Sequence, residues 1–274
     1  MTTSIYDQPP MERFKRERAL AHAPVRLEIE RLVCGSDYGG TSWTTVDEAD
    51  RVLELLELAP GKRLLDVGAG SGWPGLYFAN ATGCEVVLTD IPFHGLVFAV
   101  ERAAADDLSD ICSFSVADAA ALPFGTGAFD AVSHSDVLCC LEPKLAALRS
   151  SRRVVRGGGR TAFTMISIPP GISAADREEA VAVSPPFTHT DETYPAMLAA
   201  TGWRATDHID LTDVFLDSSR RMQREEEAHA DELTEMYGAK DFAERLRRRR
   251  ARVDILERGL LRRELFAATA SGDG

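Results

Sequence analysis

The chain has 274 residues, 45% of them hydrophobic and 27% charged, and a formal net charge of −12. This length and composition fit a folded α/β protein and exclude fibrous and fully disordered classes, while the acidic balance argues against a nucleic-acid partner. Five cysteines without paired spacing and no apolar run of roughly 18 residues predict a cytoplasmic protein with reduced thiols and no membrane span.

The first 57 residues predict helices joined by a glycine-rich loop. Apolar residues recur at helical spacing over 10 to 33, and Pro24 divides this stretch into two helices. Glycines break the pattern over 34 to 43, and a further helix over 45 to 58 has acidic residues in its first turn. The chain therefore begins with helices rather than with a sheet.

Short β-rich runs alternate with helical stretches from residue 63 onward. This alternation is typical of a parallel sheet covered by helices on both faces, so we predict an α/β, doubly wound fold. The glycines at 157–159 are expected to form the turn into the fifth strand, and a helix is expected over 191–201. The expected strands are 63–68, 85–90, 112–117, 129–135, 159–168, 203–211 and 264–270.

A helical insertion is predicted between the sixth and seventh strands. Its apolar residues recur at helical spacing and include Met222, Met236, Tyr237 and Phe242. The insertion either covers a pocket as a lid or packs against a second copy to form a homo-oligomer, and both roles can coexist. We interpret the arginine-rich run 245–252 within it as a solvated helix face.

A glycine-rich segment follows the first predicted strand and reads Asp-Val-Gly-Ala-Gly-Ser-Gly-Trp-Pro-Gly over 66–75. Glycines let a backbone approach a ligand closely, and the following helix start offers unpaired N–H groups. Gly70, Gly72 and Gly75 fit the dinucleotide fingerprint, and Asp90 lies where a ribose-binding acid is expected, so a nicotinamide-dependent oxidoreductase is one alternative. Asp66 favours another ligand, because its carboxylate suits an ammonium group and repels a pyrophosphate.

These motifs and their order resemble the class I S-adenosylmethionine-dependent methyltransferases over about residues 58 to 166. The similarity extends to Ala-Asp-Ala-Ala-Ala-Leu-Pro-Phe at 117–124, Phe-Asp-Ala-Val at 129–132 and Arg-Val-Val-Arg-Gly-Gly-Gly at 153–159. The resemblance implies a Rossmann-like seven-stranded, mostly parallel sheet with an antiparallel last strand, and S-adenosyl-L-methionine as cofactor. It also implies four segments: 1–57 with a cofactor-closing loop, the binding core 58–212, the insertion 213–259, and the last strand with its tail 260–274.

The resemblance assigns cofactor roles to particular residues. Asp66 would orient the methionine end, Asp90 would accept both ribose hydroxyls, and Asp118 would face the adenine amino group. Tyr38 and Trp43 in the loop before the sheet would face the pocket, unless they anchor a helix junction instead. The expected cofactor-binding residues are Asp66, Gly68, Gly70, Gly72, Asp90, Ile91, Asp118, Ala119, Ser135 and Tyr38.

Methyl transfer from a sulfonium requires no metal, because the leaving group is already activated, and a general base is optional. Residues 137–141 replace a His-rich sequence common in similar proteins, which removes one imidazole. Position along the chain favours Asp136 and His189 as catalytic residues, whereas His134 is expected to be an interior residue.

The function expected from the sequence is methylation of an oxygen, nitrogen or carbon atom of a small, partly apolar molecule. The many arginines and alanines favour bacterial specialised metabolism. A non-catalytic cofactor-binding protein is a further alternative, as is a nucleic-acid methyltransferase, which salt-sensitive binding to RNA or DNA would reveal.

Overall fold

Seven strands form one sheet in the order β3-β2-β1-β4-β5-β7-β6. The computed structural model describes residues 16–17, 19–40 and 44–272. All neighbouring strands pair in parallel except β7, which is antiparallel to both β5 and β6. The strands are β1 Arg63–Val67, β2 Glu85–Asp90, β3 Cys112–Val116, β4 Phe129–Ser135, β5 Val155–Ser167, β6 Trp203–Asp210 and β7 Arg262–Ala270. The predicted seven-stranded, mostly parallel sheet with an antiparallel last strand is confirmed.

Two strands begin earlier than the sequence predicted, and four strands end one residue earlier. β5 begins at Val155, so the glycines at 157–159 lie within the strand rather than in a turn before it. The pairing between β4 and β5 shifts register between Phe129 and Ala131, which accommodates these glycines. β7 begins at Arg262, two residues before the predicted start, because its pairing with β5 already starts there.

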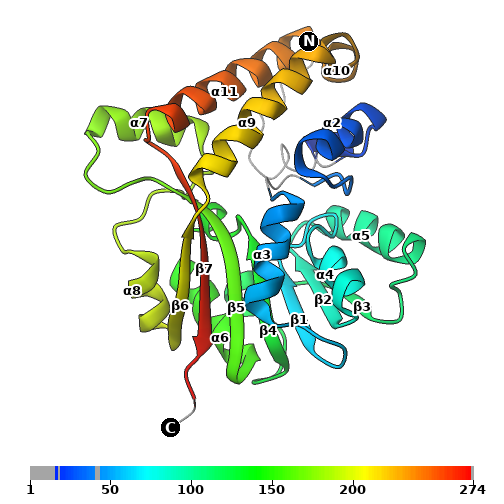
Figure 1. The fold of residues 1–274 in the computed structure, drawn as a ribbon, viewed down its shortest axis with the longest axis vertical. Coiled ribbons are helices and arrows are strands. Elements are labelled where there is room, and N and C mark those ends of the chain that lie inside the picture. The colour runs from blue at the N-terminus through cyan, green and yellow to red at the C-terminus, as the bar shows by residue number, and fades with distance from the viewer. Residues whose placement is uncertain (1–15, 18, 41–43, 273–274) are drawn as a thin grey trace.

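Helices cover both faces of the sheet. Successive side chains of β1 point to opposite faces, and those on both faces are buried. Leu64 packs into the core of one face and Leu65 into the core of the other, and both are fully buried. Figure 1 shows α3 in front of the sheet, with α4 and α5 beside it. These helices are α3 Val46–Leu56, α4 Gly75–Thr82 and α5 Phe93–Ala105, and the opposite face carries α6 Lys144–Val154 and α8 Tyr194–Ala200.

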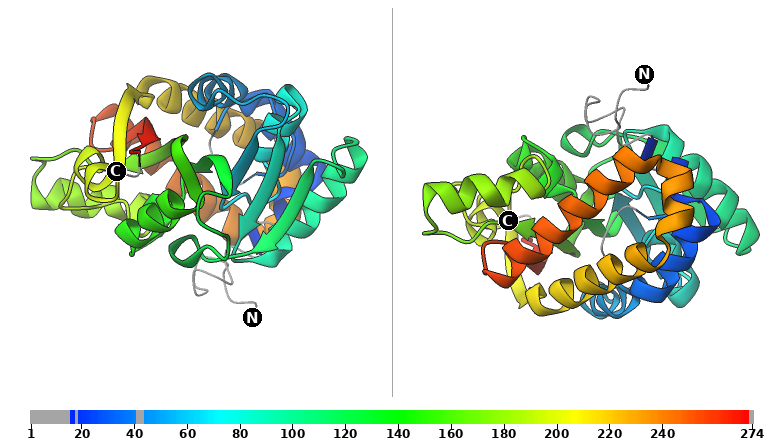
Figure 2. Two further views of the ribbon diagram at one scale, coloured as in Figure 1. Left: turned by 90° about the horizontal axis from the view of Figure 1, so that it is seen from below. Right: turned by 90° about the horizontal axis from the view of Figure 1, so that it is seen from above.

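A helical layer lies over the carboxyl ends of the parallel strands, at the top of Figure 1 and facing the viewer in the right-hand panel of Figure 2. We call this layer the cap; it comprises α2 Pro24–Cys34, α7 Ala174–Val183, α9 Thr212–Ala228, α10 Ala230–Tyr237 and α11 Ala239–Glu257. Met222 and Phe242 of the insertion pack against Ile29 and Val33 of α2 in one apolar cluster. The predicted helical insertion thus forms the cap together with the N-terminal helix.

The sequence prediction missed α7. Ser173 caps this helix by accepting a hydrogen bond from the Asp176 amide, and its hydroxyl donates to the Asp176 carboxylate at 2.7 Å. A Ser-x-x-Asp sequence is a helix-start signal and could have identified α7. α8 begins at Tyr194, after the expected start at 191, because Thr193 is its capping residue. None of the described helices is both long and apolar enough to cross a membrane.

Candidate functional site

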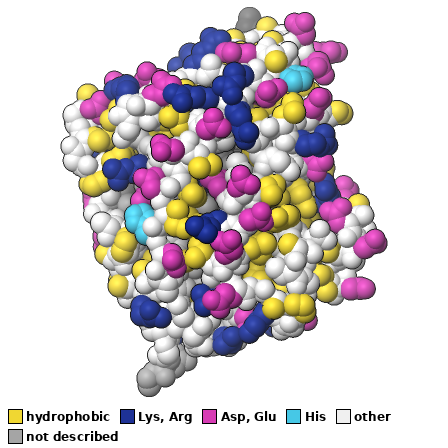
Figure 3. Space-filling model, viewed as in Figure 1, with side chains coloured by type: hydrophobic (Ala, Val, Ile, Leu, Met, Phe, Trp, Pro, Cys, Tyr) yellow, Lys and Arg dark blue, Asp and Glu magenta, His cyan; other side chains and the backbone are white. Residues whose placement is uncertain are grey.

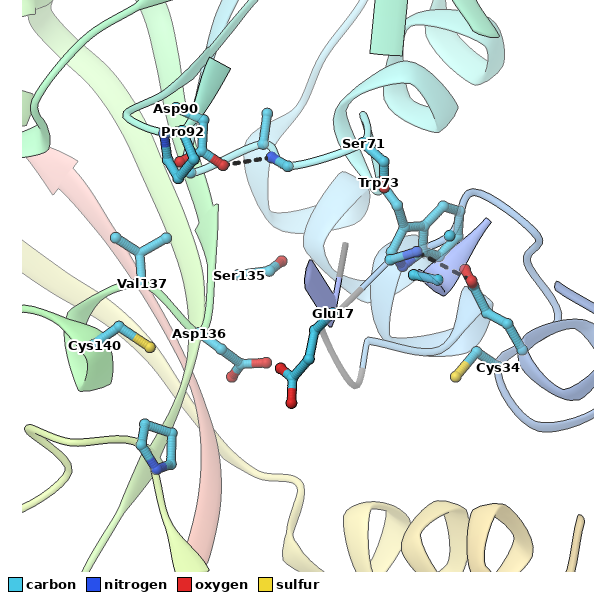
Figure 4. A pocket seen from close by; sticks show the side chains of 18 of the residues that line it. Glu17, Cys34, Ser71, Trp73, Asp90, Pro92, Ser135, Asp136, Val137 and Cys140 are labelled. Carbon is cyan, nitrogen blue, oxygen red and sulfur yellow. Dashed lines mark hydrogen bonds between the residues drawn. The ribbon is translucent and has the colours of Figure 1, made fainter. Parts of the chain in front are cut away.

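A cavity of about 390 Å³ lies between the carboxyl ends of the parallel strands and the cap. Its wall combines the loop after β1, the end of β2, the turn after β4, and side chains from α2, α9 and α11. In Figure 4, Asp90 stands on one side, Ser135 and Asp136 at the end of β4, and Trp73 with Cys34 across from them. The carboxyl edge of a parallel sheet, where the strand order reverses beside β1, is where open α/β folds place their ligands.

The loop after β1 presents its backbone to this cavity. Gly68 and Ala69 donate hydrogen bonds to the Thr89 carbonyl at 2.7 and 2.9 Å, which fastens the loop to the end of β2. Gly68 has a φ of 73°, and a β-carbon there would collide with Val137. Gly68 and Gly70 line the cavity, whereas Gly72 packs against Leu76.

Asp90 ends β2 and is buried in the cavity wall. Its two carboxylate oxygens accept hydrogen bonds from the Gly70 and Ile91 amides, at 2.9 and 2.8 Å. Figure 4 shows the bond to the glycine loop as a dashed line. Each oxygen has acceptor capacity beyond these bonds, so Asp90 can also receive donors from a ligand. Ile91 and Ser135 line the same cavity.

Asp66 lies beneath the loop and outside the cavity lining. It is almost fully buried and accepts a hydrogen bond from the Ser133 hydroxyl at 2.9 Å. Gly75 lies directly against its carboxylate, where a β-carbon would not fit. Burial raises the pKa of Asp66 to about 7, and the charge of Asp90 adds to this effect. The structure therefore places Asp66 under the loop and outside the cavity lining, and its role toward the methionine end stays a prediction.

Asp136 follows β4, lines the cavity and has a φ of 55°, in the left-handed region. Its Oδ2 accepts a hydrogen bond at 3.0 Å from Arg263 of β7, a residue with no exposed surface. The same guanidinium donates to Glu48 at 3.2 Å and to the Thr44 hydroxyl at 2.9 Å. Arg263 thus connects the end of β4 to the start of α3, and it fixes one oxygen of a carboxylate that faces the cavity.

Several residues expected at the site lie away from the cavity. His189, the other proposed catalytic residue, does not line the cavity. Its side chain is 39% exposed, and its Nε2 lies 3.5 Å from Oδ1 of the exposed Asp191. Asp118 is exposed at the end of β3, where it accepts a hydrogen bond from the Ala120 amide, and Ala119 is buried. Of the two catalytic candidates, only Asp136 is brought to the cavity.

Trp73 and Arg102, to which the sequence assigned no role, contact the loop before α3. Trp73 donates a hydrogen bond to the Thr44 carbonyl at 2.9 Å and packs against Tyr38, whose ring also contacts the Arg102 guanidinium. Tyr38 is therefore an anchor of the loop and does not line the cavity. Trp43 lies outside the described residues.

Glu30 of α2 organises the same loop. Its carboxylate accepts hydrogen bonds from the Ser36 hydroxyl and from the Tyr38 and Gly40 amides, at 3.0, 3.2 and 3.0 Å. Gly40 lines the cavity, as Glu30 itself does. Burial raises the pKa of Glu30 to about 7 despite these three donors.

We expect Glu30 to make folding less favourable as pH rises from about 4.5 to 7. Because the folded-state pKa lies above the unfolded one, the folded protein binds the proton more tightly, and this advantage is lost as pH rises through the window. The free energy of unfolding of wild type minus that of Glu30→Gln should fall with pH by at most about 1.4 kcal/mol per unit. Urea unfolding at several pH values tests this, with the exposed Glu28→Gln as control; a constant difference would contradict it.

The arginine run in α11 differs from the prediction of a solvated face. Arg247 and Arg250 are more than 60% exposed, as expected. Arg249 is buried, however, and it lines the cavity together with Arg245, Arg248 and Arg252. The spacing 245, 248, 249 and 252 places these four on one helix face, a signal that was present in the sequence. In Figure 3, Lys and Arg side chains also gather over the outer surface of the cap.

Comparison with known proteins agrees with this architecture. A family model described as "Methyltransferase domain" matches residues 65–163. The chain is 26% identical to phosphoethanolamine N-methyltransferase of Triticum aestivum over 80% of its length and 43% of the wheat protein. It is 34% identical to 27-O-demethylrifamycin SV methyltransferase of Amycolatopsis mediterranei, over 47% of this chain and 51% of that protein. The chain thus spans about half the length of these curated relatives.

A solved structure extends the similarity to nearly the whole chain. The [4+2]-cyclase SpnF has 22% sequence identity and a TM-score of 0.75, with 97% of this chain and 98% of that chain covered. At this identity the likeness concerns the fold alone. It includes the cap as well as the sheet.

Proposed function

Because the chain belongs to the class I S-adenosylmethionine-dependent methyltransferases, we propose that it transfers a methyl group to an oxygen, nitrogen or carbon atom of a small, partly apolar molecule. The observation that carries this proposal is the meeting of three features in one cavity. They are the glycine loop after β1, the Asp90 carboxylate after β2, and the Asp136 carboxylate after β4. S-adenosyl-L-methionine supplies an activated methyl group when it is bound.

The residues at the sheet edge fit this cofactor. Asp90 offers carboxylate oxygens to ribose hydroxyls, and its bonds to Gly70 and Ile91 hold those oxygens in place. Gly68 and Gly70 allow the methionine part to approach the backbone. Asp118 and Ala119 follow the neighbouring strand β3 and are proposed to contact the adenine, while Ser135 lines the wall after β4.

The acceptor is proposed to occupy the part of the cavity between β4 and the cap. Val137, Cys140 and Leu141 follow β4 and line this cavity, and Met222 and Tyr237 line it from the insertion. These side chains favour a partly apolar acceptor and exclude water from the reacting atoms. The insertion therefore acts as a lid in this proposal. The similarity to a rifamycin methyltransferase supports a role in bacterial specialised metabolism.

Asp136 is proposed to orient the acceptor by accepting a hydrogen bond from its hydroxyl or amine. We expect Asp136→Asn to lower turnover by about tenfold, because a misoriented acceptor reaches in-line geometry less often. The affinity for S-adenosylhomocysteine should stay within about twofold, since the proposed role of Asp136 concerns the acceptor and not the cofactor. Transfer of labelled methyl groups to a panel of small phenols, alcohols and amines identifies an acceptor and measures this effect. A parallel loss of cofactor affinity and turnover would contradict the assigned role.

A further inference from the structure

We propose that the cap end of the cavity binds an anionic group of the acceptor, a carboxylate or a phosphate, through arginines of α2 and α11. This inference rests on the proposed function, because it specifies the chemical class of the acceptor. The four inward-facing arginines of α11 and Arg26 of α2 line one continuous cavity with Asp90 and Asp136. One cavity therefore joins the proposed methyl-transfer end to a cationic end.

The arrangement of these arginines is specific to the cavity side of α11. Arg247 and Arg250, on the other side, form exposed ion pairs with Glu244 and Glu227 at 2.6 and 2.8 Å. On the cavity side, Arg249 is 8% exposed and the side chain of Arg245 is 12% exposed. Burying guanidinium groups is costly unless anions lie close to them, so this wall of the cavity favours an anionic ligand over a neutral one.

One fully buried carboxylate forms ion pairs with three of these arginines. Glu226 of α9 has no exposed surface and pairs with Arg26, Arg245 and Arg249 at 2.8, 2.7 and 2.9 Å. These cations hold the pKa of Glu226 well below its usual range, although burial opposes them. Glu226 therefore holds three of the guanidinium groups together on the cavity side of the cap.

Repulsion within the cluster supports an additional anion. Burial lowers the pKa of Arg252, and the charges of Arg249, Arg248 and Arg245 lower it further. Five arginines line the cavity, and of the carboxylates that line it among the described residues, Asp90 and Asp136 stand at the sheet edge and Glu17 and Glu30 in the N-terminal segment. Within the part of the chain that the structure describes, the buried Nε donor of Arg26 has no hydrogen-bond partner. A ligand oxygen can accept from it.

Carboxylates and phosphates fit this end of the cavity because a guanidinium offers paired, planar N–H donors to two oxygens at once. The same cavity is also lined by apolar side chains such as Val137 and Leu141. An acceptor with an anionic group at one end and a nucleophile at the other would therefore bind in one orientation. Its anionic group would lie toward the cap and its nucleophile toward the end of β4.

Calorimetric titration with three matched probes tests this inference: phenyl phosphate, benzoate and neutral benzyl alcohol. Each is titrated into the full chain at low salt, with and without saturating S-adenosylhomocysteine. We expect at least one anion to bind about tenfold more tightly than benzyl alcohol. Arg248→Gln should weaken that anion about tenfold, whereas Arg247→Gln on the exposed side should leave it unchanged. The tighter of the two anions distinguishes a phosphate from a carboxylate.

Two results would overturn the inference. The first is anion binding no tighter than that of benzyl alcohol, and the second is an equal loss in Arg248→Gln and Arg247→Gln. Circular dichroism and thermal unfolding establish that Arg248→Gln is folded, and Arg248→Lys, which keeps the charge, should recover part of the binding. S-adenosylhomocysteine binding without anion selectivity would refute this inference and leave the proposed function standing. Anion selectivity without binding of S-adenosylhomocysteine would refute the proposed function.

Discussion

Replacing Arg263 by methionine is expected to lower the free energy of unfolding by about 3 to 5 kcal/mol, because it leaves two buried carboxylates without their cation. Arg263 has no exposed surface and pairs with Glu48 and Asp136 at 3.2 and 3.0 Å. It also donates to the Thr44 and Thr164 hydroxyls and lies over the ring of Phe215. Its removal eliminates the side-chain contacts that join the loop before α3, the end of β4 and the cap helix α9. Urea unfolding measures the effect.

Arg262→Met is the matched control for this prediction. Arg262 is the preceding residue of β7 and is exposed, so its loss should change stability by less than about 0.5 kcal/mol. Adding Glu48→Gln and Asp136→Asn to Arg263→Met should recover part of the stability, since neutral side chains need no cation. Equal unfolding midpoints for Arg263→Met and Arg262→Met would show that the buried network does not stabilise the fold.

Replacing Asp90 by asparagine is expected to weaken S-adenosylhomocysteine binding by about 1 to 3 kcal/mol, or roughly ten- to hundredfold. The amide keeps one acceptor oxygen but replaces the other by a donor that faces the Gly70 or Ile91 amide. The ribose hydroxyls lose a charged acceptor, and the glycine loop loses one of its attachments to β2. Titration calorimetry measures the change.

Asp110→Asn provides the control for Asp90→Asn. Asp110 is exposed and precedes β3, at the amino end of the strand that ends beside Asp90. The Asp110→Asn variant should bind S-adenosylhomocysteine with the affinity of the wild-type protein. Undiminished affinity in a folded Asp90→Asn protein would mean that the ribose does not lie at the end of β2.

Most of the sheet could be predicted because its strands carry local signals. Each core strand is a short apolar run followed by a helix, and the pattern alone placed β2 and β4 at their observed bounds. The glycines at 157–159 misled the prediction, because glycine favours turns but also fits a strand whose pairing shifts register. No local signal in the sequence reveals which neighbouring strand permits such a shift.

The sequence predicted those parts of the candidate site that lie at the end of a single strand. Gly68, Gly70 and Asp90 follow β1 and β2 directly, and the structure places them in one cavity. Arg263 was missed because its partners are distant in sequence, since it meets Glu48 across 215 positions. Glu30 was missed because its partners Ser36, Tyr38 and Gly40 lie in an irregular loop that has no periodic pattern. His189 was favoured by its position along the chain, but the segment after β5 leaves its side chain outside the cavity lining. Long-range packing of this kind is set by the tertiary fold rather than by local pattern.

The most direct test of the central claim is calorimetric titration of the full chain with S-adenosylhomocysteine, with NAD as the parallel ligand. The account predicts micromolar binding of S-adenosylhomocysteine, which corresponds to about 8 kcal/mol, and no binding of NAD. The Asp66 carboxylate under the glycine loop disfavours a pyrophosphate there. Binding of NAD without binding of S-adenosylhomocysteine would contradict the account.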